Sequence, residues 1–359
     1  MQSASHCVLV PDVTRRSVIR AERVSIQWDP SMPVFAKEEF LSAVSDEYGW
    51  LGGIDESGTV RCVLPYTIVR KAGLRMVRFR VETIARGEGL DLVGEKSFLN
   101  NAVQYFRTIG ADVIIPPTNN AIFRTYPDGA SPAPYGSYVI ALQQSEDALW
   151  KNVSKTTRYD IRKAQKEGVT VREGMELVDP AYDLILETFR RSKLSFMSRE
   201  SFKEFVLSLG QNAKLLVAEH QGVAQSYALF AFSEHCAYWI YGGNVENHHE
   251  GAMKLLQWNA ILLFRSLGVR KFDFFGARIN PPKGSKQEGI NRMKKHLGAT
   301  LAEGYVWKYS LRPWRAWVYS KSVRFLRGGD LVDQEQHKLN EHSSNPEAGA
   351  AGYPVTELS

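Results

Sequence analysis

Four cations recur at helical spacing near the middle of the chain, where they could bind phosphate. Within Ser154–Gly168, the serine is a favoured N-cap residue and the glycine a favoured helix stop. At about 100° per residue, the four cations fall within about 80° of one another, and we call them the basic stripe: Lys155, Arg158, Arg162 and Lys166. The opposite face carries Thr157, Ile161 and Ala164. Like charges at this spacing repel, which favours an anionic partner. The alternative is a solvated basic face, with Asp160 and Glu167 as countercharges.

The net charge of +6 hides a contrast between the body and the tail of the chain. After Arg327, six acidic residues and one lysine give a net charge of −5, so the preceding body carries +11. Such a body favours a phosphate-bearing partner, namely nucleic acid, a nucleotide-sugar or a membrane surface. The polar tail 328–359 has no hydrophobic periodicity, which predicts disorder.

Other chemistry finds little support in the sequence. It has no G-x-S-x-G elbow, no P-loop and no G-x-G-x-x-G after a strand. The three cysteines are scattered and the histidines His248, His249 and His296 lack ligand company, so we predict no metal site and no bound cofactor. No apolar run reaches 18 residues and the N-terminus does not resemble a secretory signal, so we expect a cytoplasmic protein.

The chain also repeats itself. Asn101–Ala111 reads NAVQYFRTIGA, and Asn259–Val269, 158 positions later, reads NAILLFRSLGV. Each copy is a helical pattern closed by a glycine and followed by a strand-like run. A helix that ends at a glycine before a strand is common in proteins, so the alternative is that the two segments are similar by chance. The ungapped match and the order of the surrounding elements favour a duplication, with a cleft between the copies.

The order of the expected elements predicts the fold class. In the second copy three antiparallel strands, at 213–219, 223–232 and 236–241, precede a helix at 250–267 and a strand at 271–275. This is the order of a GNAT-type acyltransferase. We therefore predict an α/β (α+β) fold of two tandem GNAT-like domains, each a mixed, mostly antiparallel sheet flanked by helices. The predicted divisions are 1–145, 146–312 with the linking helix 154–168, a basic aromatic helix 313–327, and the tail 328–359.

Four segments, in the right order, resemble the Fem family of aminoacyltransferases, which build peptidoglycan cross-bridges. The linking helix matches that family's R-x-x-I-x-K-A-x-K-x-G-V pattern at Arg158, Ile161, Lys163, Ala164, Lys166, Gly168 and Val169. YWIYGGN at 238–244, FRSLGVRKFDFFG at 264–276 and GINRMKKHLG at 289–298 resemble three further family motifs. The resemblance covers roughly residues 145–310 well and the first unit weakly.

The resemblance implies a compact enzyme that uses aminoacyl-tRNA rather than acetyl-CoA. Lys294 matches the family lysine that meets the tRNA end and stabilises the transition state. Met293 replaces that lysine's aromatic neighbour, which leaves the stacking role open. Amide formation from an ester passes through an oxyanion that needs positive charge or N–H donors. Lys294 could supply that charge, or it could be a surface lysine beside Arg292 and Lys295.

Three further residues are weaker candidates. Tyr241 ends a strand before a Gly-Gly turn, so it could contact substrate or pack in the core. Asp273 could orient an amine or cap a neighbouring element. Arg199 could bind an acceptor phosphate, although its spacing fits the family poorly.

The segment Tyr305–Arg327 holds seven aromatic and six basic residues and no acid. Beyond Pro313, a helix would place Trp314, Trp317, Val318 and Phe325 on one side. That side either docks on the protein body or lies at an anionic membrane surface, which would put the protein at the inner face of the plasma membrane.

Three functions remain open at this stage. The first is a monomeric Fem-type enzyme that moves an amino acid from tRNA to an amine of a phosphate-bearing envelope precursor, with roles in peptidoglycan synthesis and cell shape. The second is an acyl-CoA or acyl-carrier N-acyltransferase of exopolysaccharide or envelope biosynthesis. The third is a non-catalytic RNA or membrane-surface binder. HHEGAM at 248–253 keeps only the central glycine of the diphosphate-binding Q/R-x-x-G-x-G/A pattern, which favours tRNA over CoA.

Overall fold

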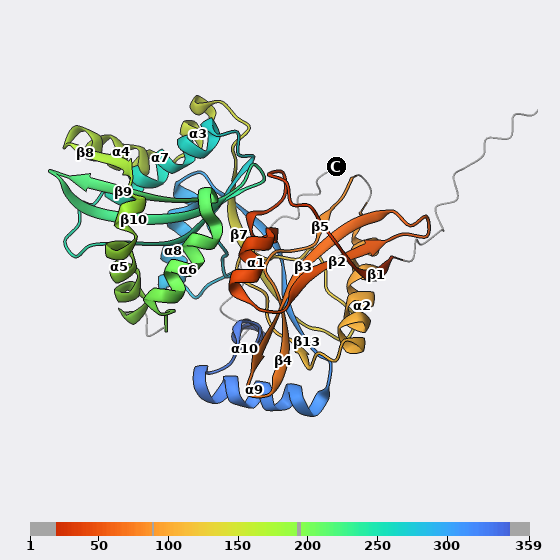
Figure 1. Ribbon diagram of the computed structural model, residues 1–359. Coiled ribbons are helices and arrows are strands. Elements are labelled where there is room, and N and C mark those ends of the chain that lie inside the picture. The colour runs from red at the N-terminus through yellow and green to blue at the C-terminus, as the bar shows by residue number, and fades with distance from the viewer. Residues whose placement is uncertain (1–18, 88–89, 192–194, 345–359) are drawn as a thin grey trace, which may run out of the picture.

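The computed structural model describes residues 19–87, 90–191 and 195–344 (Figure 1). The first half of the chain contains β1 (Arg20–Val24), η1 (Val34–Ala36), α1 (Glu38–Val44), β2 (Tyr48–Ile54), β3 (Val60–Lys71), β4 (Leu74–Phe79), β5 (Ile84–Ala85), α2 (Leu92–Thr108), β6 (Val113–Ile114) and β7 (Ser131–Ala141). The second half contains α3 (Glu146–Asn152), α4 (Lys155–Lys166), β8 (Val169–Glu173), η2 (Met175–Leu177), α5 (Val178–Arg191), α6 (Arg199–Leu209), η3 (Gly210–Asn212), β9 (Ala213–His220), β10 (Val223–Phe232), β11 (Ala237–Asn244), α7 (Ala252–Ser266), β12 (Lys271–Asp273), α8 (Lys286–His296) and β13 (Thr300–Ser310). Two helices follow, α9 (Pro313–Arg327) and α10 (Leu331–Ser344).

Both halves belong to one continuous 13-stranded sheet with the order β1-β2-β3-β4-β6-β13-β7-β12-β11-β10-β9-β8, and β5 pairs with β3. This order is nearly symmetric about its centre, so β1 to β4 and β6 correspond to β8 to β12. In the second half α4 and α7 lie on one face of the sheet, and α5 and α6 lie on the other (Figure 1). The fold class predicted from the sequence, a tandem GNAT-like α/β fold, is confirmed.

The two repeated segments are structurally equivalent. Both helices end on a residue at φ −80° and ψ 4°, Ile109 in α2 and Leu267 in α7. The following glycines, Gly110 and Gly268, both adopt φ 76°, the left-handed conformation that glycine takes without steric cost. The next strands, β6 and β12, each pair in parallel with the fourth strand of their own half. The duplication is therefore present in the fold.

The last strand of each half pairs with the opposite half. The strand that follows β6 in the chain is β7, but β7 pairs with β12, and β13 pairs with β6. The two exchanged strands also pair with each other over nine residue pairs, from Thr300↔Val139 to Lys308↔Ser131. Trp307 of β13 is fully buried in the first half's core, where its ring contacts Phe79 and Phe123. The halves therefore share strands as well as an interface.

The tail prediction is wrong for residues 331–344, which form α10. Val332 is fully buried against Ala133, Tyr135 and Val306. Lys308 of β13 donates to both Asp330, at 3.0 Å, and Asp333, at 2.5 Å. Two of the acids that made the segment look solvated are thus bound by a lysine of the body. Residues 345–359 of the predicted tail, and residues 1–18 of the predicted first domain, lie outside the described residues.

None of the helices in the described part of the chain is both long enough and apolar enough to span a lipid bilayer.

The exchange of strands predicts that the halves unfold together. Trp307→Ala should lower the free energy of unfolding by about 3–5 kcal/mol, because it empties the first half's core. Urea unfolding, followed by fluorescence and circular dichroism, should show one transition. The matched control is Trp314→Ala, which removes a tryptophan that is 65% exposed and should change stability by about 0.5 kcal/mol or less. Two separate transitions, or equal effects of both substitutions, would contradict the exchange.

Candidate active site

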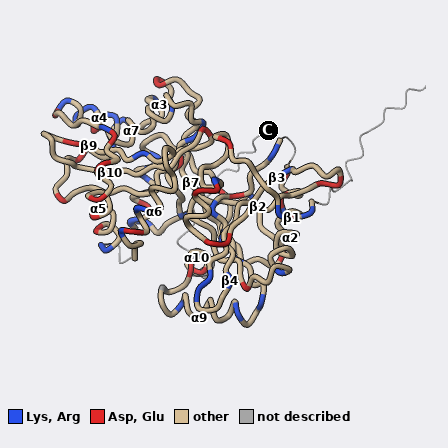
Figure 2. Tube along the Cα trace, in the orientation of Figure 1, with Lys and Arg blue, Asp and Glu red and all other residues tan. Residues whose placement is uncertain are grey.

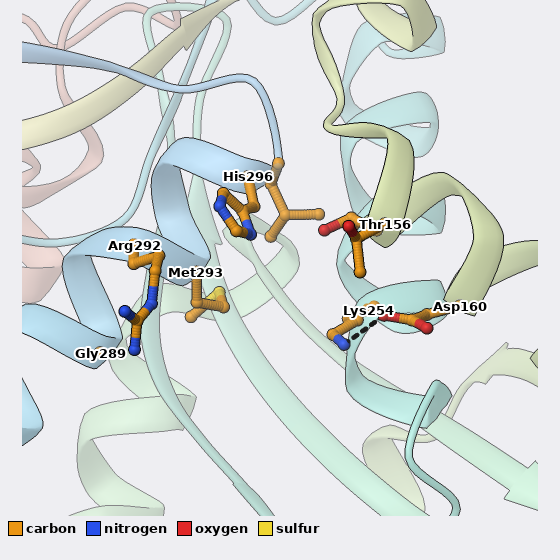
Figure 3. Close-up of a pocket in the computed structure, with 9 residues that line it drawn as sticks. Thr156, Asp160, Lys254, Gly289, Arg292, Met293 and His296 are labelled. Carbon is orange, nitrogen blue, oxygen red and sulfur yellow. Dashed lines mark hydrogen bonds and ion pairs between the residues drawn. The ribbon is translucent and has the colours of Figure 1, made fainter.

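A groove opens in the second half where two parallel strands part. β11 pairs with β12 only at Ala237↔Phe272 and Tyr238↔Asp273, and then continues to Asn244 with β10 as its one neighbouring strand. Two adjoining pockets of about 200 and 470 Å³ lie there, and both touch Lys254, Gly289 and Met293. The smaller pocket is drawn in Figure 3, between α4, α7 and α8. Its other lining residues are Thr156, Thr157, Asp160, Arg292, His296 and Leu297. The larger pocket adds Trp239, Gly242, Gly243, Asn244, His248, Glu250, Met253, Lys286 and Ile290.

The equivalent opening in the first half is filled by the chain itself. β4 and β6 also part after two residue pairs, Met76↔Val113 and Val77↔Ile114. The loop after β6 then occupies the gap, because Thr118 N donates to Phe79 O at 3.1 Å. The side chain of Asn120, which is 4% exposed, donates to Arg80 O at 2.9 Å. Among the described residues, the opening between β4 and β6 is therefore filled, whereas the opening between β11 and β12 borders the groove.

Lys294 lies behind the groove wall rather than on the protein surface. Its side chain on α8 is 5% exposed, and its Nζ donates to Phe274 O at 3.0 Å and to Gly276 O at 2.6 Å. Burial lowers the pKa of Lys294 to about 8, and the negative charge of Asp273 acts in the opposite direction. The expectation of a surface lysine is wrong, whereas its neighbour Lys295 is exposed.

Asp273 fixes the turn to which Lys294 binds. Its Oδ1 accepts from Ser137 Oγ at 2.5 Å and from Phe275 N at 2.7 Å, and Ser137 Oγ accepts from Gly276 N at 2.9 Å. Burial raises the pKa of Asp273, and the nearby Lys271 opposes that shift. Phe275 has φ 58°, a conformation that non-glycine residues adopt at a cost and that these contacts hold in place. Asp273 thus positions the 274–276 turn.

Met293 borders both pockets, and the stick view shows its side chain between α8 and α7 (Figure 3). Lys254, which the sequence did not single out, binds Asp160 of α4 at 2.6 Å across the smaller pocket. Lys254 could have been found from the sequence, because it directly follows HHEGAM in the first turn of the predicted helix.

Three of the four basic-stripe residues are exposed, and the fourth, Arg158, is hydrogen-bonded to α3. α4 buries Thr157, Ile161 and Ala164 as predicted. Lys155, Arg162 and Lys166 are exposed, and the Arg162 guanidinium lies 5.4 Å from the ring centroid of Trp150. The expected countercharges are bound by other residues, since Asp160 pairs with Lys254 and Glu167 with His249. They do not neutralise the exposed part of the stripe.

Arg158 is half-buried, and its side chain binds the end of α3. Its Nη1 donates to Trp150 O at 3.1 Å and Lys151 O at 3.2 Å, so it satisfies carbonyls at the end of α3. This contact caps the end of α3, and phosphate contact by Arg158 stays a prediction. The sequence could not distinguish these roles, because α3 and α4 pack only in the folded chain.

Tyr241 and Arg199 lie away from the groove. A bulge opposite Leu229 and Phe230 shifts the alternation of β11, so Trp239 lines the groove while Tyr241 packs on the other face. There its ring lies 5.1 Å from that of Phe196, and burial raises its pKa to about 12.

Arg199 pairs with Asp179 at 3.0 Å and with Asp183, and its guanidinium lies 4.5 Å from the Tyr182 ring centroid. Its charge is thus compensated within α5 and α6.

Sequence reasoning also missed a buried carboxylate between the halves. Burial raises the pKa of Glu82 to about 7, and Lys271 of the second half opposes that shift. Its Oε2 is buried without a hydrogen-bond partner among the described residues. Glu82 lies in an irregular stretch before β5, where no local pattern marks it.

The comparisons with known proteins agree with this architecture. Residues 129–224, which include β7, α4 and β9, match the model of the FemAB family. The solved structure of FemX is 14% identical, with a TM-score of 0.64, and the match covers 83% of this chain and 99% of that one. The C-terminal domain of a putative lysylphosphatidylglycerol synthetase from Agrobacterium fabrum is 12% identical, with a TM-score of 0.50 and coverage of 80% and 92%. No curated protein matches the sequence. The resemblance to the Fem family is confirmed, and the solved structures show the fold.

The buried ammonium of Lys294 makes stability depend on pH. Folded Lys294 loses its proton near pH 8, whereas the unfolded chain keeps it to about pH 10.4. Between these two pH values the unfolded state therefore binds more protons than the folded state. The contribution of Lys294 to the free energy of unfolding grows as pH rises through this range, and it is lost as pH falls through 8. We expect wild type to gain about 2 kcal/mol relative to Lys294→Met between pH 8 and 10 in urea unfolding. Lys295→Met is the control, and identical pH profiles for the two variants would contradict a buried charge.

Proposed function

We propose that this protein is a Fem-type aminoacyltransferase that moves an aminoacyl group from tRNA to an amine of a peptidoglycan-type envelope precursor. The observation that carries the proposal is the groove of the second half, which lies beside the basic stripe of α4. The FemAB-matched segment contributes α4 to one wall of that groove. A groove of this size next to exposed cations suits the charged end of a nucleic acid with its acyl group inside.

The reaction would be amide formation by direct transfer. The neutral acceptor amine attacks the ester carbonyl, and a C–N bond forms as the carbonyl becomes an oxyanion. Collapse of that intermediate breaks the C–O bond to the ribose, whose oxygen takes up the proton that the amine loses.

An ammonium has three N–H donors, and Lys294 uses two of them on Phe274 O and Gly276 O. We assign its third N–H to the oxyanion. Because Lys294 lines neither pocket, this assignment puts the reacting carbonyl at the 274–276 turn, where β11 and β12 part.

The first turn of α7 argues for tRNA rather than acyl-CoA as the donor. CoA enzymes of this fold bind diphosphate on the backbone N–H groups of that helix start. Here α4 packs against it so closely that a Cβ on Gly251 would lie 2.6 Å from Asp160 O. Acyl-CoA remains the alternative donor for the experiment to exclude.

A transfer assay tests the activity directly. Purified protein is given either tRNA charged with radiolabelled amino acids or radiolabelled acyl-CoA, together with amine-bearing peptidoglycan precursors. We expect label to enter the acceptor only from tRNA. Label from acyl-CoA alone would establish the alternative, and binding of tRNA without transfer would point to a non-catalytic RNA binder.

Lys294→Met should reduce kcat about a hundredfold or more, the typical loss on removing one oxyanion donor. If the lysine only held donor phosphate, the loss would appear in KM and shrink at saturating tRNA. Because Lys294 is buried, the melting temperature is measured alongside, and kinetics are compared at a temperature where the variant stays folded. Lys295→Met, on an exposed face of the same helix, should keep nearly full activity. Equal effects of the two variants would remove Lys294 from the site.

The exposed part of the basic stripe should contribute to tRNA affinity. Arg162→Gln with Lys166→Gln should weaken tRNA binding and lower the slope of log K against log salt by roughly 1–2, because fewer counterions are released. The control is Arg190→Gln with Arg191→Gln at the end of α5, which removes equal charge from another helix. An unchanged salt slope in the α4 variant would show that the stripe is only a solvated face.

A further inference from the structure

We propose that the outward face of α9 docks the protein on an anionic lipid surface. Three aromatic side chains on this helix are largely exposed: Trp314 by 65%, Trp317 by 62% and Phe325 by 91%. Together with Val318 they fall within about 100° of the helix circumference. They share one side of a helix of 15 residues, and we call this side the aromatic face.

The aromatic face is presented to solvent because the opposite side of α9 holds the helix in place. Ala316, which is 7% exposed, packs with Leu74, Met76 and Val113 of the first half. Arg315 Nη1 donates to Gly73 O at 2.8 Å and to Asp112 Oδ2 at 3.0 Å. The helix is therefore fixed to the sheet by small and polar contacts, and its largest apolar side chains take no part in the core.

Charge complementarity selects anionic lipid as the partner. Lys321 lies within the aromatic face and Arg324 borders it, and both are exposed. No acidic residue occurs in Pro313–Arg327, and Figure 2 shows α9 with basic segments only. The Lys321 ammonium lies 5.7 Å from the Trp317 ring centroid. Tryptophan interleaved with cations suits the boundary between headgroups and acyl chains, where the ring is buried and the charge meets phosphate.

A second copy of this chain fits the face less well. Pairing two aromatic faces would bring Lys321 and Arg324 of both copies together without an acid on either helix. The nearest acids in the chain, Asp330 and Asp333, are already bound by Lys308. A lipid surface supplies the missing negative charge, and we therefore expect a monomer that binds membranes.

The position of α9 sets the orientation of the bound protein. α9 lies at the bottom edge of the molecule, and α4 and α7 lie at the opposite end (Figure 1). A bilayer under the aromatic face would leave the basic stripe and the groove facing the aqueous side.

Co-sedimentation with vesicles tests the docking. Full-length protein is mixed with vesicles of phosphatidylcholine alone or with about one third of phosphatidylglycerol, the latter to carry the surface charge. We expect binding only to the anionic vesicles. Lys321→Gln with Arg324→Gln should weaken it by about tenfold or more, since each removed charge is worth about fivefold. Trp314→Ser with Trp317→Ser and Phe325→Ser should abolish it, and because these side chains are exposed the melting temperature should hold.

Matched controls lie elsewhere on the surface. Leu207→Ser removes another highly exposed apolar side chain, 77% exposed on α6, and Arg190→Gln with Arg191→Gln removes two charges from α5. Both should bind anionic vesicles like wild type. Retained binding in the α9 variants, equal loss in the controls, or a solution dimer that only the aromatic substitutions dissociate would overturn the proposal. These outcomes are independent of the transfer assay, so either conclusion can fail alone.

Discussion

The structure depends on the exchange of β7 and β13 between the two halves of the chain. Each half completes its sheet and core with a strand from the other, as the burial of Trp307 in the first half's core shows. A shared sheet keeps the relative position of the halves fixed, because moving one would break the long β7–β13 ladder. The groove, the turn behind it and the buried Glu82 therefore belong to one rigid framework, and a site can draw residues from both halves without a hinge.

The same exchange positions the polar side chains of the candidate active site in the second half. Ser137 of β7 reaches Asp273 only because β7 pairs with β12. Asp273 and Lys294 then hold the 274–276 turn from two sides, one through amide donors and one through carbonyl acceptors. A buried acid and a buried ammonium compensate each other here, which makes a costly arrangement tolerable and preorganised. The equivalent turn in the first half is instead covered by the loop that carries Thr118 and Asn120.

Much of this could be read from the sequence. The repeat at 101–111 and 259–269 predicted two equivalent units, and both helices end with the same capping geometry. Helical spacing predicted that Thr157, Ile161 and Ala164 would be buried beneath the basic stripe, and that the large apolar residues of α9 would share one side. The four motifs indicated a resemblance to the Fem family, and the family match over residues 129–224, which contain the first of these motifs, supports that resemblance. Each of these inferences rests on a local period or a local cap, which the chain encodes within a few residues.

What the sequence alone determined was therefore local: the types of the elements, their faces and the duplication. Only the tertiary structure decided which charged side chains have a partner, because ion pairs and hydrogen bonds join residues that are distant in the chain. It buried Lys294 against carbonyls, turned Arg158 onto the end of α3, and bound the tail's acids to Lys308 so that α10 could form. It also turned Tyr241 away from the groove through a bulge that shifts the strand's alternation. Burial and partnership are properties of the packed chain, and they set the chemical role of each residue.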